Sequence, residues 1–243
     1  DQPRSTDLML LLAVAYERSG SIELAAKQYA NAARNSDFAP GPGLDYVAFL
    51  SRRGRGDEAE DVLAELSSRH PDNVDVLSAL ARLRLDRQDW SGAREIAETL
   101  QRLGKKTGLA DQILGAVSSG QRNYKDSVAS LTRAYEANPG EAQSMFALVR
   151  SYVLAKQPEK ADAFLDLVLS KNAASAEAHV LKGLLKMSNN LPDAAAESFK
   201  SAIEANPKSP VGYQALADLR IKQKRYDDAV EVLRNGLREE PSS

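Results

Sequence analysis

The sequence predicts an all-α protein, a right-handed α-solenoid of seven 34-residue helix-turn-helix repeats. The first sign is the phrase Glu-Ala-Asn-Pro, which ends at Pro139 and returns at Pro207, 68 residues later. Half of that distance is 34, and steps of 34 divide the chain into seven repeats without insertion or deletion. Within a repeat, apolar residues follow helical spacing in two blocks separated by a short polar turn. Such a helical hairpin cannot bury its apolar face alone, so the hairpins are expected to stack.

The repeats follow a short lead-in at residues 1–5. One solenoid domain then covers residues 6–243, with repeats at 6–39, 40–73, 74–107, 108–141, 142–175, 176–209 and 210–243. In the last repeat the polar turn at 222–228 separates the two blocks, so the first helix precedes it and the second helix follows it.

Three positions of the repeat hold a fixed kind of residue. The eighth position is small or β-branched: Ala13, Val47, Ala81, Gly115, Val149, Gly183 and Ala217. The twentieth is small throughout: Ala25, Ala59, Ala93, Ser127, Ala161, Ala195 and Ala229. The twenty-fourth is large in all repeats but one: Tyr29, Leu63, Ala97, Leu131, Leu165, Phe199 and Leu233. Small residues let the two helices of a hairpin approach closely, and the large residue fills the gap beside them.

Proline ends the second helix in four repeats. It occupies the thirty-second position as Pro71, Pro139, Pro207 and Pro241. Proline lacks the N–H that would continue the helix, and it biases the preceding residue away from helical geometry. These prolines are therefore expected to separate one hairpin from the next.

This pattern of length, small residues, large residue and terminal proline resembles the tetratricopeptide repeat family over residues 6–243. The departures are mild: Asp37, Lys105 and Ala173 replace the terminal proline, and the fourth position, often Trp in the family, varies here. The resemblance implies a solenoid whose first helices line a concave groove. It also implies a function in binding other proteins.

Composition excludes several other classes. The formal net charge is −2 and no basic patch stands out, so nucleic acid is not an expected partner. The chain has no cysteine, which rules out disulfides, thiolate metal sites and a cysteine nucleophile. The longest apolar run, residues 8–16, is too short to span a bilayer, so direct membrane insertion is not expected.

No catalytic, metal or cofactor site is predicted, and the chain is expected not to be an enzyme. His70 and His179 lie more than a hundred residues apart, and each takes a position that favours a structural role. The segment at 103–108, Leu-Gly-Lys-Lys-Thr-Gly, lacks the earlier glycine of a phosphate-binding loop. Trp90, Tyr124 and Tyr226 share the seventeenth position and are expected to pack against the turn.

The candidate partner-binding residues lie on the first helices. Helical spacing together with the family resemblance places positions two, five, nine, twelve and thirteen on the inward face. The candidates are Arg82, Gln112, Phe146, Arg150, Leu154, Val180, Leu184, Met187, Gln214 and Ile221. The C-terminal half of this face is apolar, which favours a helix or an extended apolar peptide, and Arg82 and Arg150 could pair with a partner carboxylate. The alternative is that neighbouring repeats or flanking sequence cover these side chains.

The sequence leaves the biological setting open. Both ends lack the polar face of a capping repeat, which indicates either an excerpt from a longer array or end-to-end self-association. The leading hypothesis is a non-enzymatic scaffold that resembles those of bacterial exopolysaccharide synthesis and secretion systems, which favours the periplasm over the cytoplasm. The alternatives are a cytosolic assembly factor and a regulatory or targeting module of a larger enzyme.

Overall fold

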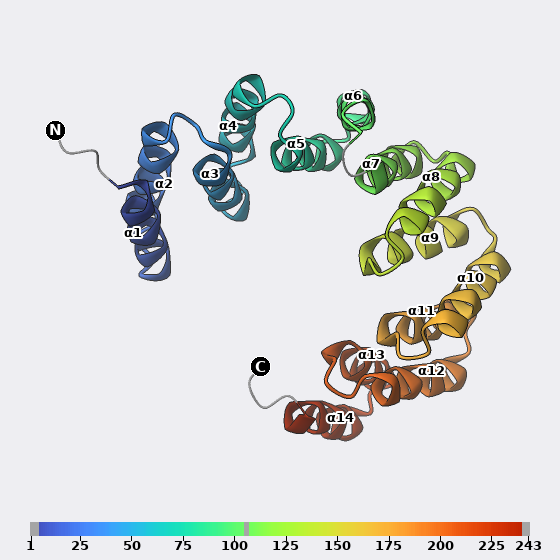
Figure 1. Ribbon diagram of the computed structural model, residues 1–243. Coiled ribbons are helices and arrows are strands. Elements are labelled where there is room, and N and C mark those ends of the chain that lie inside the picture. The colour runs from blue at the N-terminus through green and yellow to red at the C-terminus, as the bar shows by residue number, and fades with distance from the viewer. Residues whose placement is uncertain (1–4, 105–106, 240–243) are drawn as a thin grey trace. The chain divides into compact units, whose positions relative to one another are not determined.

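The computed structural model describes residues 5–104 and 107–239, and in these residues it contains α-helices and no strand (Figure 1). The helical hairpins predicted from the 34-residue period are therefore confirmed. Most of the lead-in, Lys105 and the terminal Pro241 lie outside the described residues. The chain divides into two compact units, Asp1–Arg122 and Asn123–Ser243, which we call the N-terminal unit and the C-terminal unit.

The helices of the two units follow the repeat. Those of the N-terminal unit are α1 (Thr6–Arg18), α2 (Ile22–Asn35), α3 (Pro40–Arg52), α4 (Gly56–Arg69), α5 (Val74–Asp86), α6 (Trp90–Arg102) and α7 (Thr107–Gly120). Those of the C-terminal unit are α8 (Tyr124–Ala137), α9 (Ala142–Leu154), α10 (Pro158–Lys171), α11 (Ala176–Ser188), α12 (Pro192–Ala205), α13 (Pro210–Lys222) and α14 (Tyr226–Glu239). Odd-numbered helices are the first helices of repeats, and even-numbered helices are the second.

Neighbouring helices in each unit form a continuous stack. In the C-terminal unit, α9 packs on α10, α11 on α12 and α13 on α14, and each of α8, α10 and α12 also packs on the first helix that follows it. The first helices also touch one another, α9 beside α11 and α11 beside α13. The N-terminal unit repeats these contacts, with α3 beside α5 and α5 beside α7.

A left-handed residue ends the first helix of every repeat. These residues have φ between 58° and 80° and lie at the fifteenth position: Gly20, Gly54, Gln88, Arg122, Lys156, Asn190 and Lys224. Such a residue turns the chain so that the following N–H groups bond to the last carbonyls of the helix, as the Gln157 N–H does to the Tyr152 carbonyl at 2.9 Å. The turn between the two helices of a hairpin therefore has the same geometry in the hairpins that lie within one unit.

The apolar core follows the three repeated positions. Ala195 is fully buried and Phe199 is 1% exposed. The ring of Phe199 lies directly against Gly183, where an added Cβ would clash with ring carbons Cε1 and Cδ1. A residue without a Cβ at the eighth position of α11 thus admits the phenylalanine ring at the twenty-fourth position, in α12.

A charged cluster joins the first two hairpins of the N-terminal unit. The Glu17 carboxylate, at the end of α1, accepts hydrogen bonds from Arg52 at 3.0 Å, Arg53 at 3.2 Å and the Tyr29 hydroxyl at 3.2 Å. The hydrogen bond from Arg52, more than any other contact, holds the pKa of Glu17 below its usual value. Glu17 and Arg52 hold the twelfth and thirteenth positions of their repeats, which were expected to face inward, and the two side chains neutralise each other.

Replacing Glu17 with glutamine is expected to lower the free energy of unfolding at neutral pH by about 0.5–1 kcal/mol, because Arg52 is largely exposed. A lowered folded pKa means that this stabilisation is present above the unfolded pKa and is lost as the pH falls through the folded pKa. Urea unfolding, followed by circular dichroism at several pH values, should therefore show the variant and the parent converging in acid. Glu58→Gln, which removes a pair with Arg55 within one helical turn, is the control and should shift the midpoint less.

Candidate functional site

The candidate site is a groove in the C-terminal unit between α9 and α11. It has a volume of about 570 Å³. Helix α9 contributes Gln143, Phe146, Ala147, Val149, Arg150, Val153 and Leu154, and helix α11 contributes Leu181, Leu184, Leu185 and Ser188. Because both are first helices that touch each other, the groove belongs to the face on which the partner-binding residues were expected.

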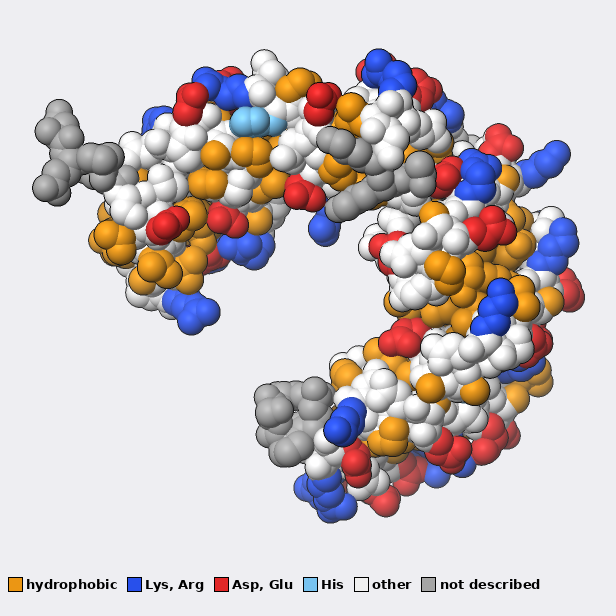
Figure 2. Space-filling model, in the orientation of Figure 1, with side chains coloured by type: hydrophobic (Ala, Val, Ile, Leu, Met, Phe, Trp, Pro, Cys, Tyr) orange, Lys and Arg blue, Asp and Glu red, His pale blue; other side chains and the backbone are white. Residues whose placement is uncertain are grey.

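Large apolar side chains are exposed along this groove. Phe146 is 40% exposed, Leu154 39% and Leu184 46%. Figure 2 shows hydrophobic side chains gathered over the region of α9 to α11. Beneath them, Val149, Leu181 and Leu185 are buried and form part of the core between α9, α10 and α11. A contiguous apolar surface on a rigid floor is typical of a surface that binds another protein.

Arg150 is the one charged side chain that lines the groove. It is exposed and makes no hydrogen bond or ion pair with the described residues. Some other basic side chains of the same unit are paired, Lys182 with Asp166 and Lys200 with Glu197. The Arg150 guanidinium therefore keeps its five donors available for an anionic group beside an apolar surface.

The structure brings together four of the candidate residues: Phe146, Arg150, Leu154 and Leu184. Val180 does not belong with them. It is 7% exposed and packs into the core formed by α11, α12 and α13, so the expectation that it faces a partner is corrected. Met187 is half-buried against the same core.

The remaining candidates lie elsewhere. Gln214 lines a different pocket, at the end of the C-terminal unit, and Ile221 is exposed near the end of α13. In the N-terminal unit, Arg82 is exposed on α5 and Gln112 is half-buried on α7. None of these four residues lines the groove between α9 and α11.

Gln143 and Val153 also line the groove and hold the inward positions two and twelve. Five further groove residues were not expected from the sequence: Ala147, Val149, Leu181, Leu185 and Ser188. Ser188 holds the thirteenth position of its repeat, so the spacing rule could have found it. Each of the other four is the sequence neighbour of a residue at an inward position, and they form the floor of the groove. No sequence signal distinguishes such a floor residue from a residue of the core.

Three of the residues considered for chemistry or ligand binding lie against backbone groups. The His70 ring lies 3.0 Å from the Phe38 carbonyl and the His179 ring 3.1 Å from the Ala173 carbonyl, each a contact with backbone. The Trp90 ring packs against the backbone at Gly120. Tyr226 differs from the expectation: it is 60% exposed, because no helix follows α14 in the described part of the chain.

Two kinds of feature are absent from the described residues. Residues 5–104 and 107–239 contain no group of His, Asp and Glu that could hold a metal ion. Over the same residues, no helix has both the length and the apolar character needed to cross a membrane.

Stacked helical hairpins with an apolar groove on their first helices define a repeat protein of the protein-binding class. One family model described as tetratricopeptide repeat matches residues 46–114, 119–185 and 186–243, and a second model with the same description matches residues 1–41. The chain belongs to the tetratricopeptide repeat family. Proteins of this fold generally act as scaffolds for protein and peptide partners.

The similar proteins include a cellulose synthase operon protein and a type IV pilus biogenesis factor. The chain is 24% identical to the cellulose synthase operon protein C of Pseudomonas fluorescens over 92% of its length, but it spans only 18% of that protein. A solved tetratricopeptide repeat protein of Parabacteroides merdae superposes with a TM-score of 0.65 at 18% identity, covering 89% of this chain and 84% of that one. The Pseudomonas aeruginosa PilF structure superposes with a TM-score of 0.58 at 14% identity, over 88% of this chain and 97% of that one. PilW, a type IV pilus biogenesis factor, gives 0.63 at 18% identity over 87% and 98%. At these identities the structural matches show the fold alone.

Proposed function

We propose that the chain is a non-enzymatic scaffold that binds a protein segment in the groove between α9 and α11. The observation that carries the proposal is the exposure of Phe146, Leu154 and Leu184 around a single unpaired arginine. Apolar side chains of the partner would cover these residues and supply most of the binding energy.

The groove also defines the chemistry of the segment. The unpaired Arg150 would pair with an aspartate or glutamate of the partner, or with its terminal carboxylate, and bidentate pairs of this kind fix orientation. Apolar residues spaced by three or four would place successive side chains against Phe146 and Leu184 if the segment is helical. The expected partner is therefore an apolar segment with one acidic group.

The biological setting is proposed from the relatives. The likeness to a cellulose synthase operon protein supports a place in a bacterial exopolysaccharide synthesis or secretion system, in which the periplasm would be the compartment. The chain spans only 18% of that relative, so a role for this chain within a longer protein of that kind is part of the proposal. A cytosolic assembly factor and a regulatory or targeting module of a larger enzyme are the alternatives. The sequence that flanks the array in the gene would distinguish these three settings. A β-barrel pattern or a lipoprotein signal supports the exopolysaccharide system, and a catalytic domain supports the module of a larger enzyme.

Leu184→Asp is expected to weaken binding of groove peptides by about 10- to 100-fold, because a carboxylate at the centre of the groove opposes apolar burial. Helix content should stay unchanged, since Leu184 is 46% exposed. The probe is a set of 15-residue peptides selected on the parent chain from a random displayed library, and the readout is fluorescence anisotropy.

Leu167→Asp is the matched control, since Leu167 is 53% exposed on α10 and does not line the groove. It should bind the peptides as the parent does. If the selected peptides bind Leu184→Asp as tightly as the control, the groove is not the binding site. Loss of helix in Leu184→Asp would show that the side chain has a structural role.

A further inference from the structure

The ninth residue of the repeat is exposed on most of the first helices. It is exposed in α3, α5, α9 and α11 as Ala48, Arg82, Arg150 and Leu184, although further described helices follow each of them. The same position in α13 is Asp218, which is also exposed. The exposure of this position is therefore a property of the inward face of the first helices and does not depend on whether another hairpin follows.

Three of these ninth residues form a row across the C-terminal unit. Helix α9 packs beside α11 and α11 beside α13, so Arg150, Leu184 and Asp218 follow one another across the three helices. The row is basic, apolar and acidic in that order. Packed helix axes lie about 8–10 Å apart, which places the helices of the two charged residues about 16–20 Å apart. At that distance the two charges do not neutralise each other.

Neither charge of the row is explained by the rest of the chain. Asp218, like Arg150, makes no hydrogen bond or ion pair with residues 5–104 and 107–239. Both residues lie outside the first and last turns of their helices, where a charged side chain would stabilise the helix dipole. Aspartate is also a poor helix former inside a helix, so helix stability does not account for Asp218.

Two other charged residues hold inward positions on these three helices, and each has a local explanation. Glu177 lies in the first turn of α11, and Lys222 lies in the last turn of α13. Each has the sign of charge that the helix dipole favours at that end of a helix. The charges of Arg150 and Asp218 are therefore the ones left for a partner.

The surface between the two charges is apolar. Next to Leu184, the twelfth residues of the three helices are Val153, Met187 and Ile221. Val153 is 37% exposed and Ile221 is 46% exposed, and Met187 on the helix between them is half-buried. This second row continues the apolar surface of the groove as far as α13.

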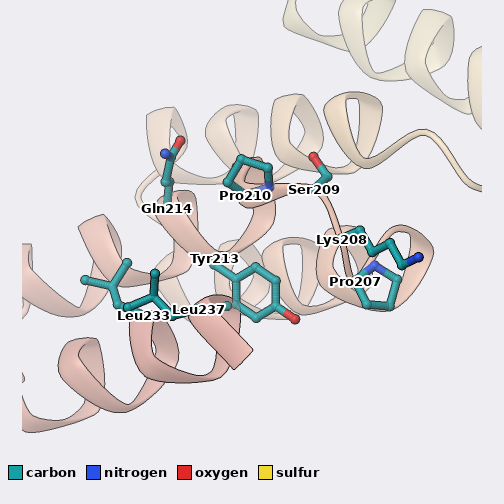
Figure 3. Close-up of a pocket in the computed structure, with 9 residues that line it drawn as sticks. Pro207, Lys208, Ser209, Pro210, Tyr213, Gln214, Leu233 and Leu237 are labelled. Carbon is teal, nitrogen blue, oxygen red and sulfur yellow. The ribbon is translucent and has the colours of Figure 1, made fainter. Parts of the chain in front are cut away.

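The α13 end of the surface is polar. Figure 3 shows the Tyr213 ring beside Leu233 and Leu237 of α14, whereas Gln214 points away from them. Gln214 is exposed at the fifth position of α13, one helical turn before Asp218. A segment that reaches α13 therefore meets an amide and a carboxylate there, after an apolar and basic surface at α9.

We propose that the bound segment crosses α9, α11 and α13 with a fixed polarity. An acidic residue of the segment pairs with Arg150, apolar residues cover Leu184, and a basic residue pairs with Asp218. The proposal rests on the proposed function and adds a second charged anchor and a direction. A segment with the opposite order of charges is rejected, because it would set like charges against each other at both ends.

The row also sets the spacing of the two charges in the segment. Across about 16–20 Å, an extended segment has its acidic and basic residues about five or six positions apart. A helical segment has them about eleven to thirteen positions apart. The 15-residue peptides selected on the parent chain are long enough for both, and their sequences should show one of these spacings with apolar residues between the charges.

Asp218→Lys should weaken binding of the selected peptides about 10-fold in fluorescence anisotropy, because a like charge then faces their basic residue. Replacing that basic residue of the peptide with glutamate should weaken its binding to the parent chain and restore its binding to Asp218→Lys. Such a rescue would not follow if Asp218 had only a structural role. Should Asp218→Lys lose helix content in circular dichroism, Asp218→Asn takes its place and should weaken binding about threefold.

Asp193→Lys is the matched control, since it makes the same change of charge at an exposed residue of α12, a second helix. It should bind the peptides as the parent does. Peptides that lose affinity for Leu184→Asp but bind Asp218→Lys as tightly as this control would overturn the fixed polarity and leave the proposed function standing. Failure of the charge exchange to restore binding would overturn it as well. Peptides that bind Leu184→Asp unchanged would overturn both proposals.

Discussion

Replacing Phe199 with alanine is expected to lower the free energy of unfolding by about 3–5 kcal/mol, the usual cost of a large cavity in a packed core. The ring is 1% exposed and lies in the core formed by α11, α12 and α13, so the lost volume cannot fill with solvent. Collapse around the cavity is restricted, because Ala195 and Ala202 of the same helix are already in close contact with their neighbours and fully buried. Phe199→Ala should therefore be among the most damaging single changes in the C-terminal unit.

Phe146→Ala is the matched control for this prediction. The residue type and the unit are the same, but Phe146 is 40% exposed in the groove, so its removal should change the free energy of unfolding by much less. Urea unfolding followed by circular dichroism measures both variants. Equal losses for the two would contradict the assignment of Phe199 to the core and of Phe146 to a binding surface.

The positions of the helices could be predicted from the sequence because local packing repeats every 34 residues. A small residue such as Gly183 and a large one such as Phe199 meet within a single hairpin, so their order along the chain is enough to place them. The left-handed turn residue was harder to foresee. Gly20 and Gly54 carry the glycine signal, but Gln88 and Lys156 adopt the same conformation because the helices on both sides impose it.

The groove could be predicted only in part, because exposure depends on the neighbouring hairpin. Phe146 and Val180 hold the same fifth position in successive repeats, yet Phe146 is 40% exposed and Val180 is 7% exposed. Val180 lies in a core against which Val211 and Ala215 of α13 pack, so residues more than thirty positions away decide its burial. Helical spacing gives the direction of a side chain, and the size of the side chains on the adjacent helix decides whether it is covered.

A second prediction concerns the contact between Gly183 and Phe199. Gly183→Ala alone is expected to destabilise the chain by about 1–3 kcal/mol, because the new Cβ would overlap the Phe199 ring in a core without spare volume. In the Phe199→Ala background the same substitution should have the opposite sign. The ring is then absent, the methyl group fills part of the cavity, and alanine is favoured over glycine within a helix by about 1 kcal/mol.

The double-mutant cycle of these two positions measures the reversal directly. The parent, both single variants and the double variant are unfolded in urea under one set of conditions, and the coupling energy is expected to be about 2–4 kcal/mol, the difference between the two effects of Gly183→Ala. Since Gly183 lies on α11 and Phe199 on α12, that coupling reports the closeness of the two helices in one hairpin. Additive effects would mean that the helices move apart to admit a methyl group. The Phe199 ring would then not be the reason that the eighth position of α11 is a glycine.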